Sequence, residues 1–243
     1  MPRSISKSRS SQAALLSFLF FVGAWSLYAE GRLTEAVKSG NISAVRSLVK
    51  AGADANEPGA DGSTPLIWAV RSANADITDV LLAAGAKPDA VSRYRVTPLN
   101  IAAEMGNAAI LESLLAAGAD VHARNRRGQE ALHAASCGSP GSRIWNPSAQ
   151  TATIMRLVEA GADPNVHDKS GVSPLHKAIR TRCAAAVRTL LDLGADPAGR
   201  NKNGSTPMLL AMQNTGQGGT GSEEAKLQQQ EILRLLEERA TVK

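Results

Sequence analysis

Thr64-Pro65-Leu66-Ile67-Trp68-Ala69 is a stretch of sequence that the chain repeats with substitutions. It returns as Thr97-Pro98-Leu99-Asn100-Ile101-Ala102 and Ser173-Pro174-Leu175-His176-Lys177-Ala178, and in weaker form at Glu130-Ala131-Leu132 and Thr206-Pro207-Met208. In chain order, the copies start 33, 33, 43 and 33 residues apart. Gly-Ala pairs beginning at Gly52, Gly85, Gly118, Gly161 and Gly194 have the same spacings. Two markers that stay in step across one shared insertion indicate an internal repeat.

Each copy predicts a pair of short helices. The Thr or Ser is a helix N-cap, and the following Pro suits the first helical position. Leu66, Ala69 and Val70 then form one apolar stripe of a first helix. A second helix follows and ends at a glycine such as Gly85, which tolerates the positive φ of the turn. One such pair is too small to fold alone, so neighbouring pairs are expected to stack and bury their Leu side chains between them. The segment from each Gly-Ala to the next Thr projects as a finger.

The repeated segments resemble the ankyrin-repeat family, and the resemblance covers roughly residues 33–240. It implies an all-α repeat solenoid of about six stacked helix-turn-helix repeats with projecting finger hairpins. The expected repeats are 30–60, 61–93, 94–126, 127–169, 170–202 and 203–243. The opening repeat lacks Thr-Pro-Leu, as a terminal capping repeat does. Insertions at 138–147 and 214–225 are expected between the first and second helices, away from the fingers.

Residues 1–29 are typical of a secretory signal peptide. A basic, Ser-rich stretch (1–12) precedes an apolar run (13–24) and small residues at candidate cleavage sites. The alternative is an uncleaved membrane anchor, for which the apolar run is short. We therefore expect an exported protein, located in the periplasm if the host is Gram-negative or secreted otherwise, with membrane contact only if residues 1–29 remain attached.

The charge of the chain does not point to nucleic acid. The formal net charge is +5, but Arg3, Lys7 and Arg9 account for three of the positive charges. The rest of the chain has 24 basic and 22 acidic residues, which is no general basic field.

Motifs for catalysis are missing from the sequence. There is no Gly-x-Ser-x-Gly elbow, metalloprotease helix or Rossmann fingerprint. The glycine-rich stretch 216–222 lacks the Lys of a phosphate loop, and we expect it to be a linker. His133 and His176 stand where the family uses a structural histidine, while His122 and His167 alone make a weak metal site. We expect no enzyme activity, no cofactor, no metal and no small-molecule substrate.

Two cysteines and one tryptophan offer further hypotheses. Cys137 ends a first helix and Cys183 starts a second helix of the next repeat, so in an ankyrin stack they share an edge. Because exported proteins meet oxidising conditions, a disulfide between them is one hypothesis, and two thiols are the alternative. Trp145, in the first insertion, is either a partner-binding anchor or part of a lid folded on its own repeat.

The finger segments carry a periodic basic pattern. Arg93, Arg126, Lys169 and Lys202 each lie four residues before the Thr-equivalent position. Stacked repeats would set them about 10 Å apart. Further members of this basic stripe are Arg124, His167 and Arg200, with Tyr94, Arg95 and Arg127 adding to it in repeats three and four. The stripe is a candidate docking surface for an acidic protein patch. The alternative is that these side chains only solvate the finger tips.

The resemblance implies protein recognition through a concave face of fingers and first helices. We predict an exported protein–protein interaction module that acts as an accessory, protective or inhibitory factor. The alternative is a passive envelope scaffold tethered by an uncleaved N-terminal helix. The size of the mature chain would distinguish the two.

Overall fold

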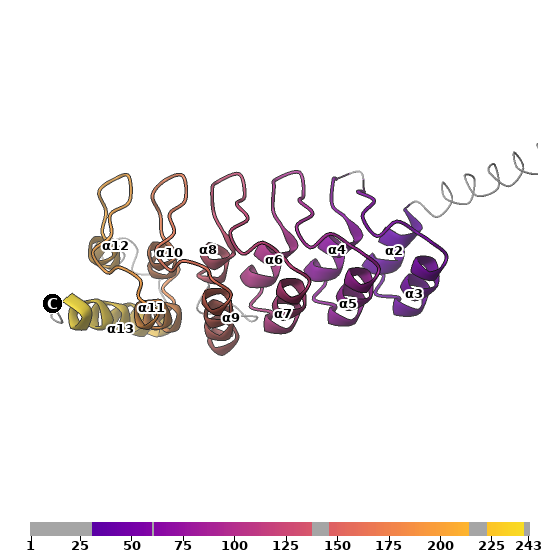
Figure 1. Cartoon of the computed structure of the whole chain (residues 1–243). Helices are drawn as coiled ribbons and strands as arrows, with labels where there is room; N and C mark the ends of the chain where they lie inside the picture. Colours follow the sequence, from indigo (N-terminus) through magenta and orange to yellow (C-terminus); the bar gives the residue numbers. More distant parts are fainter. Residues whose placement is uncertain (1–30, 60, 138–145, 214–222, 241–243) are drawn as a thin grey trace, which may run out of the picture.

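The computed structural model describes residues 31–59, 61–137, 146–213 and 223–240. Within these ranges the chain is entirely helix and connecting segments, arranged as six helix pairs in sequence order (Figure 1). The first helices of the pairs are α2 (Arg32–Lys38), α4 (Pro65–Arg71), α6 (Pro98–Glu104), α8 (Ala131–Ala135), α10 (Pro174–Arg180) and α12 (Pro207–Gln213). The second helices are α3 (Ile42–Lys50), α5 (Ala75–Ala83), α7 (Ala108–Ala116), α9 (Pro147–Glu159), α11 (Ala184–Asp192) and α13 (Glu223–Ala240). The predicted all-α repeat solenoid is confirmed. Residues 1–29 and Trp145 lie outside the described ranges.

The first helices begin where the repeated Thr or Ser predicts. The hydroxyl of Thr97 accepts from the amide of Asn100, and the Asn100 side chain accepts from the Thr97 amide, which closes a capping box. Ser173 and His176 form the same arrangement at α10. At the opening repeat, α2 follows Gly31 without a side-chain cap, in keeping with the missing Thr-Pro-Leu.

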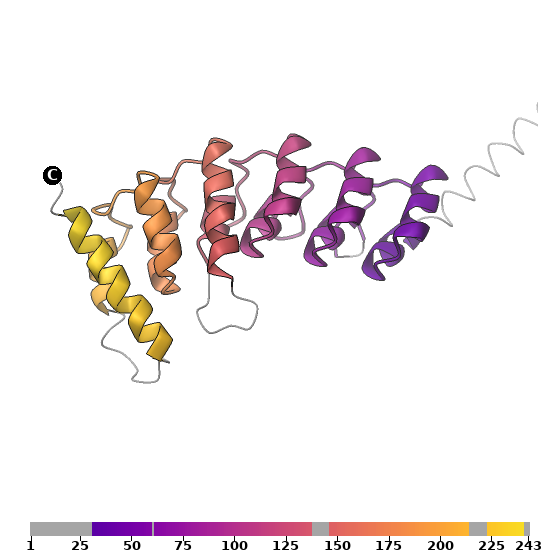
Figure 2. The ribbon, with the colours of Figure 1, turned by 90° about the horizontal axis from the view of Figure 1, so that it is seen from below.

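The core lies between neighbouring pairs. First helices form one layer and second helices another, and in Figure 2 the second helices lie side by side from α3 to α13. Leu66, Leu99, Leu132 and Leu175 are fully or almost fully buried, as are the second-helix residues that face them, such as Ile110. Each fully buried Leu stabilises the stack by roughly 1.5–3 kcal/mol. Stability therefore depends on contacts between repeats.

The two insertions change the second helices that follow them. α9 and α13 have 13 and 18 residues, whereas the other second helices have nine. The predicted insertions ended at residues 147 and 225, but Pro147 and Glu223 already begin helices. Asn146 caps α9 through the amide of Ala149, and Pro147 occupies the first helical position, so the end of the first insertion is helical.

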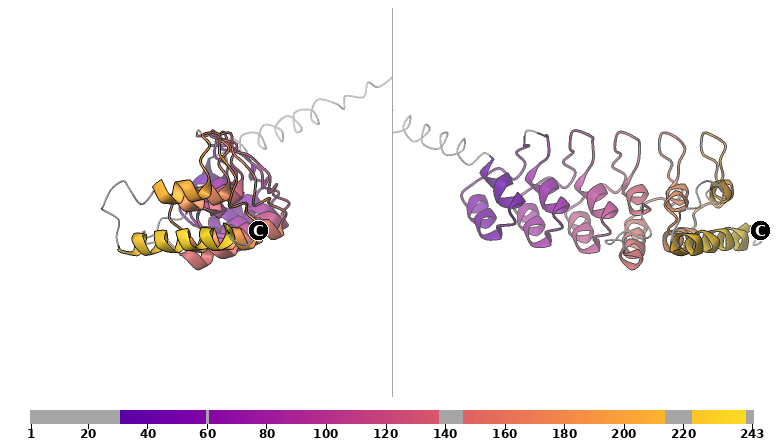
Figure 3. Two further views of the ribbon diagram at one scale, coloured as in Figure 1. Left: turned by 90° about the vertical axis from the view of Figure 1, so that its left-hand side faces the viewer. Right: turned by 180° about the vertical axis from the view of Figure 1, so that it is seen from behind.

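α13 closes the stack at its C-terminal end (Figures 1 and 3). Its Ile232, Leu235 and Leu236 are buried against the preceding repeat. Ion pairs tie its outer surface to α11, from Arg188 to Glu231 and from Arg239 to Asp192. Like the other helices in the described part of the chain, α13 does not combine the length and apolar character needed to cross a bilayer.

Candidate functional site

The fingers project from one side of the helix layers, each before a first helix (Figure 1). We number them by repeat: finger 2 is residues 54–63, finger 3 is 87–96, finger 4 is 120–129, finger 5 is 163–172 and finger 6 is 196–205. At the tips of fingers 3 to 6 the chain reverses in a tight hairpin. In finger 3 the Ser92 amide donates to the Val96 carbonyl, and the Arg95 amide donates to the Ser92 carbonyl. This is the pattern of a three-residue hairpin whose last residue is left-handed.

Fingers 4, 5 and 6 start their tip turns with Asn125, Asp168 and Asn201. In each turn, one side-chain oxygen of this residue accepts hydrogen bonds from two backbone amides further along the chain. In finger 5, for example, the amides of Ser170 and Val172 both donate to Asp168 Oδ1. Burial acts to raise the pKa of Asp168, but the Val172 amide, the Gln129 side chain and the Ser170 amide outweigh it and hold that pKa below its usual value. Finger 3 has Ser92 at this position, which accepts from the Val96 amide alone. The side chain at this position thus accepts from one backbone amide rather than two.

Backbone hydrogen bonds join the later tips to one another. The Lys169 amide donates to the Arg127 carbonyl at 3.0 Å, and the Lys202 amide donates to the Ser170 carbonyl at 3.1 Å. These close approaches need glycine at the left-handed position of the preceding tip. A Cβ on Gly128 would lie 3.1 Å from the Lys169 amide nitrogen, and one on Gly171 would lie 2.8 Å from that of Lys202. Fingers 4, 5 and 6 thus form one hydrogen-bonded set.

Arg95 breaks this series. The equivalent position in the other fingers holds Gly62, Gly128, Gly171 or Gly204, whereas Arg95 adopts the same left-handed conformation with φ of 58°. A non-glycine residue is strained there, by about 1–2 kcal/mol. The hydrogen bond equivalent to those between the later fingers would join the Arg126 amide to the Tyr94 carbonyl, and it is not formed. At Gly62, by comparison, an added Cβ would lie 3.6 Å from the Arg93 amide nitrogen, so glycine at this position does not by itself bring the next finger close.

Fingers 3 and 4 are instead in contact through the side chains of Tyr94 and Arg126. The guanidinium carbon of Arg126 lies 5.5 Å from the centroid of the Tyr94 ring, within the range of a cation–π interaction. Tyr94 remains 64% exposed. The tips of fingers 3 and 4 therefore present an exposed ring together with the guanidinium groups of Arg95, Arg126 and Arg127.

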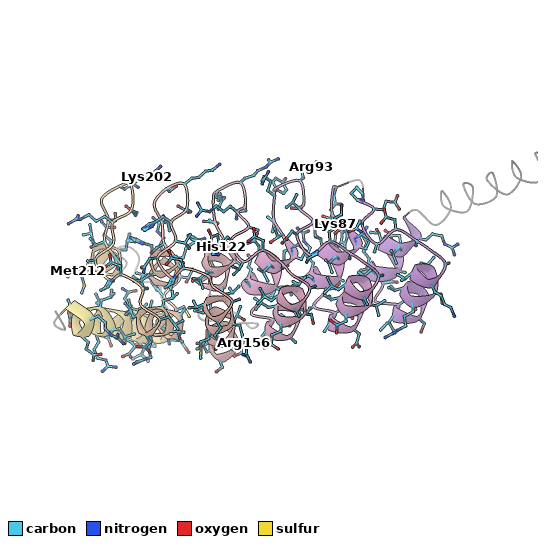
Figure 4. All side chains as sticks on the ribbon, viewed as in Figure 1. Lys87, Arg93, His122, Arg156, Lys202 and Met212 are labelled. Atoms are coloured by element: carbon cyan, nitrogen blue, oxygen red, sulfur yellow. The ribbon has the colours of Figure 1, made fainter. Side chains whose placement is uncertain are left out.

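The described residues of the predicted basic stripe are all exposed: Arg93, Tyr94, Arg95, Arg124, Arg126, Arg127, His167, Lys169, Arg200 and Lys202. Figure 4 shows Arg93 and Lys202 at the finger tips. The stripe is not uniform in charge. Finger 2 contains Asp54, Glu57 and Asp61 without a basic residue, and in finger 5 Asp163 and Asp168 accompany Lys169. Positive charge is concentrated on fingers 3 and 4.

Arg124 differs from the other members of the stripe because a buried carboxylate opposes its charge. Its guanidinium contacts Glu130 Oε1 at 2.9 Å, and the Glu130 side chain is only 2% exposed. His122 Nδ1 lies 3.5 Å from the second oxygen of Glu130, and it pairs with that oxygen when the imidazole is protonated. From the sequence alone, Arg124 was predicted to be a cation available to a partner, and its pairing with Glu130 was not predicted. The position of Glu130 at the N-cap of α8 was the signal that could have indicated this pairing.

His133 and His176 hold consecutive repeats together, as the family resemblance implied. His133 Nδ1 accepts from the Glu130 amide, and its Nε2 is 2.9 Å from the Val172 carbonyl of the next finger. His176 Nε2 makes the equivalent contact with Ser205. Burial lowers the pKa of His133 to about 4 and lowers that of His176 as well, so both are neutral near pH 7.

The two cysteines are thiols in the structure, which differs from the disulfide hypothesis. Cys137 lies two residues beyond the end of α8 rather than ending that helix, and its Sγ donates to the His133 carbonyl. Cys183 Sγ is buried and donates to Gln150 Oε1 at 3.2 Å. The side-chain nitrogen of Gln150 donates to the Ala135 carbonyl. Gln150 is thus a hydrogen-bond partner of the Cys183 thiol, whereas a disulfide would require Cys137 Sγ at that place.

The first helices add a second cationic feature that sequence analysis missed. In α4 the Trp68 ring lies 4.8 Å from Lys38 Nζ and 5.6 Å from the guanidinium carbon of Arg71. Trp68 is half-buried and its indole nitrogen is buried with no hydrogen-bond partner among the described residues. This cluster lies in the first-helix layer of repeats one and two. Among the described residues, no group of three or more His, Cys, Asp or Glu side chains is placed to hold a metal ion.

Two family models match the sequence. One, described as ankyrin repeats (3 copies), matches residues 33–125. The other, described as ankyrin repeats (many copies), matches residues 157–211. The matched residues include α3 to α7 before the first insertion and α10 and α11 after it, whereas α8, most of α9 and α13 lie outside them.

Proposed function

Because this chain belongs to the ankyrin-repeat family, whose repeats are generally protein–protein interaction modules, we propose that it binds a partner protein through its fingers and first helices. The observation that carries the proposal is the exposed row of Arg, Lys and Tyr side chains along the finger tips. Exposed Tyr and Arg side chains are the residue types that dominate binding energy at protein interfaces. Positive charge on the tips favours a partner with an acidic patch.

The partner-binding surface includes the first helices as well as the fingers. Trp68 with Lys38 and Arg71, and the exposed Met105 at the end of α6, offer apolar and cationic contacts in the first-helix layer. A curved stack of repeats makes such a surface continuous over several repeats. The chain acts as an accessory, protective or inhibitory factor for its partner, without catalysis of its own.

The site of action is outside the cytoplasm, in the periplasm of a Gram-negative host or in the medium. This part of the proposal is supported by the signal-like residues 1–29 alone. Mass spectrometry of the mature chain tests it, with loss of about 25 to 29 residues expected. An intact N-terminus in the membrane fraction would instead favour a tethered envelope scaffold.

The binding proposal is tested by charge reversal on the tips. Full-length chain is used as bait in its own compartment, and each captured protein is purified and titrated against the chain directly. Arg93→Glu/Arg126→Glu/Lys169→Glu should keep the helical circular dichroism and abolish binding. The matched control is Arg46→Glu/Lys50→Glu/Lys226→Glu, which makes the same charge change at exposed positions of α3 and α13. Equal affinity of the two variants would overturn the finger surface as the interface.

A further inference from the structure

The break in the finger series lies where the positive charge is greatest. Fingers 4, 5 and 6 are tied by backbone hydrogen bonds from Lys169 to Arg127 and from Lys202 to Ser170. Fingers 3 and 4 lack the equivalent bond, and Arg95 stands where the other tips have glycine. The backbone strain at Arg95 is a local cost to folding, and among the described residues the Arg95 side chain forms no hydrogen bond, ion pair or ring contact that would offset it. Strain of this kind is found at functional sites more often than elsewhere.

The side chains at the tips of fingers 3 and 4 are of the types that anchor a binding partner. Tyr94 is exposed, and Arg126 lies over its ring at 5.5 Å. None of Arg95, Arg126 and Arg127 forms an ion pair in the described residues, in contrast to Arg124, whose charge is opposed by Glu130. An exposed aromatic ring beside unpaired guanidinium groups suits a carboxylate-bearing ligand, since guanidinium binds carboxylate with two parallel hydrogen bonds.

We propose that the tips of fingers 3 and 4 are the primary anchor for the partner, and that the partner supplies an extended Asp- or Glu-rich segment lying across both tips. This rests on the proposed function and deepens it. Tyr94 and Arg126 provide the central contact, while Arg95 and Arg127 bind carboxylates on either side. The missing hydrogen bond between Tyr94 and Arg126 leaves one carbonyl and one amide for the backbone of the segment. Fingers 5 and 6 add only long-range attraction.

The test measures binding of a fluorescein-labelled twelve-residue peptide of Glu to the full-length chain, at one fixed salt concentration. The matched variants are Arg126→Gln/Arg127→Gln and Lys169→Gln/Lys202→Gln, each of which removes two positive charges. We expect the first to lower affinity about tenfold or more and the second by less than about threefold, because anchor residues carry most of the energy of an interface. Equal losses, or no detectable binding by the unmodified chain, would overturn the assignment.

Two comparison ligands identify the class of partner. A peptide of Gln of the same length should bind at least about tenfold more weakly than the Glu peptide, since it lacks charge. A polyphosphate of equal charge should also bind more weakly, because it offers no peptide backbone. Tighter binding to polyphosphate would assign the tips to a non-protein polyanion and overturn the proposal.

Arg95 provides a structural readout that does not depend on affinity. Arg95→Gly and Arg95→Gln remove the same charge, but only glycine allows finger 4 to approach finger 3. We expect slower hydrogen exchange at the Arg126 amide in Arg95→Gly, and affinity for the Glu peptide about threefold below that of Arg95→Gln. Identical exchange and affinity in the two variants would contradict the role given to this break. If instead the natural partner fails to bind the unmodified chain, the proposed function fails, whatever the peptide does.

Discussion

The side-chain amide of Gln150 donates a hydrogen bond of 2.7 Å to the carbonyl oxygen of Ala135. In an ordinary repeat the equivalent carbonyl accepts from the backbone amide of the second helix's N-cap, as Ala69 does from Asn74 and Ala102 from Asn107. In α9 the helix begins earlier, so its backbone amides at this level are used within the helix. A glutamine side chain replaces the lost donor. Gln229 of α13 makes the same contact with Ala211.

Gln150→Ala should therefore destabilise the protein. The change leaves the buried Ala135 carbonyl without a donor, and an unsatisfied buried group of this kind costs about 1–3 kcal/mol. Chemical denaturation measures the free energy of unfolding. The control is Gln230→Ala, which changes an exposed glutamine of α13 and should have an effect within about 0.5 kcal/mol. A loss no larger than that of the control would show that the Gln150 contact does not stabilise the extended helix.

Glycine at position 171 is required by two separate constraints. Its φ is +71°, and an added Cβ would lie 2.8 Å from the Lys202 amide nitrogen. We expect Gly171→Ala to lower the free energy of unfolding by about 2–3 kcal/mol. Gly204→Ala is the matched control, because Gly204 has φ of +77° and no atom within 4 Å of an added Cβ. It should lose only the backbone term of about 1 kcal/mol. If both variants lower the free energy of unfolding by the same amount, finger 6 moves away from the added Cβ at position 171 without a cost in stability.

Arg95→Gly should stabilise the fold. Glycine relieves the left-handed strain at φ of 58°, and after its own conformational entropy is counted the gain is about 0.5–1 kcal/mol. Thermal and chemical denaturation both report it. Arg95→Ala serves as the control, because it removes the same charge and keeps the strain. A gain of equal size in Arg95→Ala would attribute the effect to charge repulsion among the tips.

The buried histidines predict a fall in stability on acidification. Burial lowers the pKa of His133 to about 4, while an unfolded histidine titrates near 6.5. Between these values the unfolded chain binds more protons than the folded one, so stability falls as the pH drops from about 6.5 to 4. His133 contributes at most about 3 kcal/mol to this loss. His176, whose pKa is also lowered, contributes in the same direction.

His133→Asn tests the origin of that slope. Asparagine already serves the same capping position at Asn100, where it accepts from the Thr97 amide. The variant keeps the cap, loses the contact with the Val172 carbonyl and removes the titrating group. Denaturation at pH 7, 6 and 5 should give a lower stability at pH 7 and a shallower decline toward pH 5. A decline as steep as in the unmodified chain would place the acid sensitivity elsewhere.

The repeated pattern predicted the helix pairs, their order and the fingers, because those features depend on local chemistry. An N-cap hydroxyl, a proline at the first helical position and an apolar stripe act within one repeat, and a period of 33 residues carries them along the chain. The exposed residues of the basic stripe could be named for the same reason. The two insertions were placed between the correct helices, although their last residues proved to be helical.

The tertiary structure alone determined which residues of different positions along the chain are in contact. Glu130 pairs with Arg124, Gln150 accepts a hydrogen bond from Cys183, and fingers 3 and 4 lack the backbone bond that joins the later fingers. Periodicity assigns equivalent residues to equivalent places, so it cannot report where one repeat departs from the next. Those departures arise from side-chain volume and hydrogen-bond geometry across the stack, which exist only once the repeats are packed together.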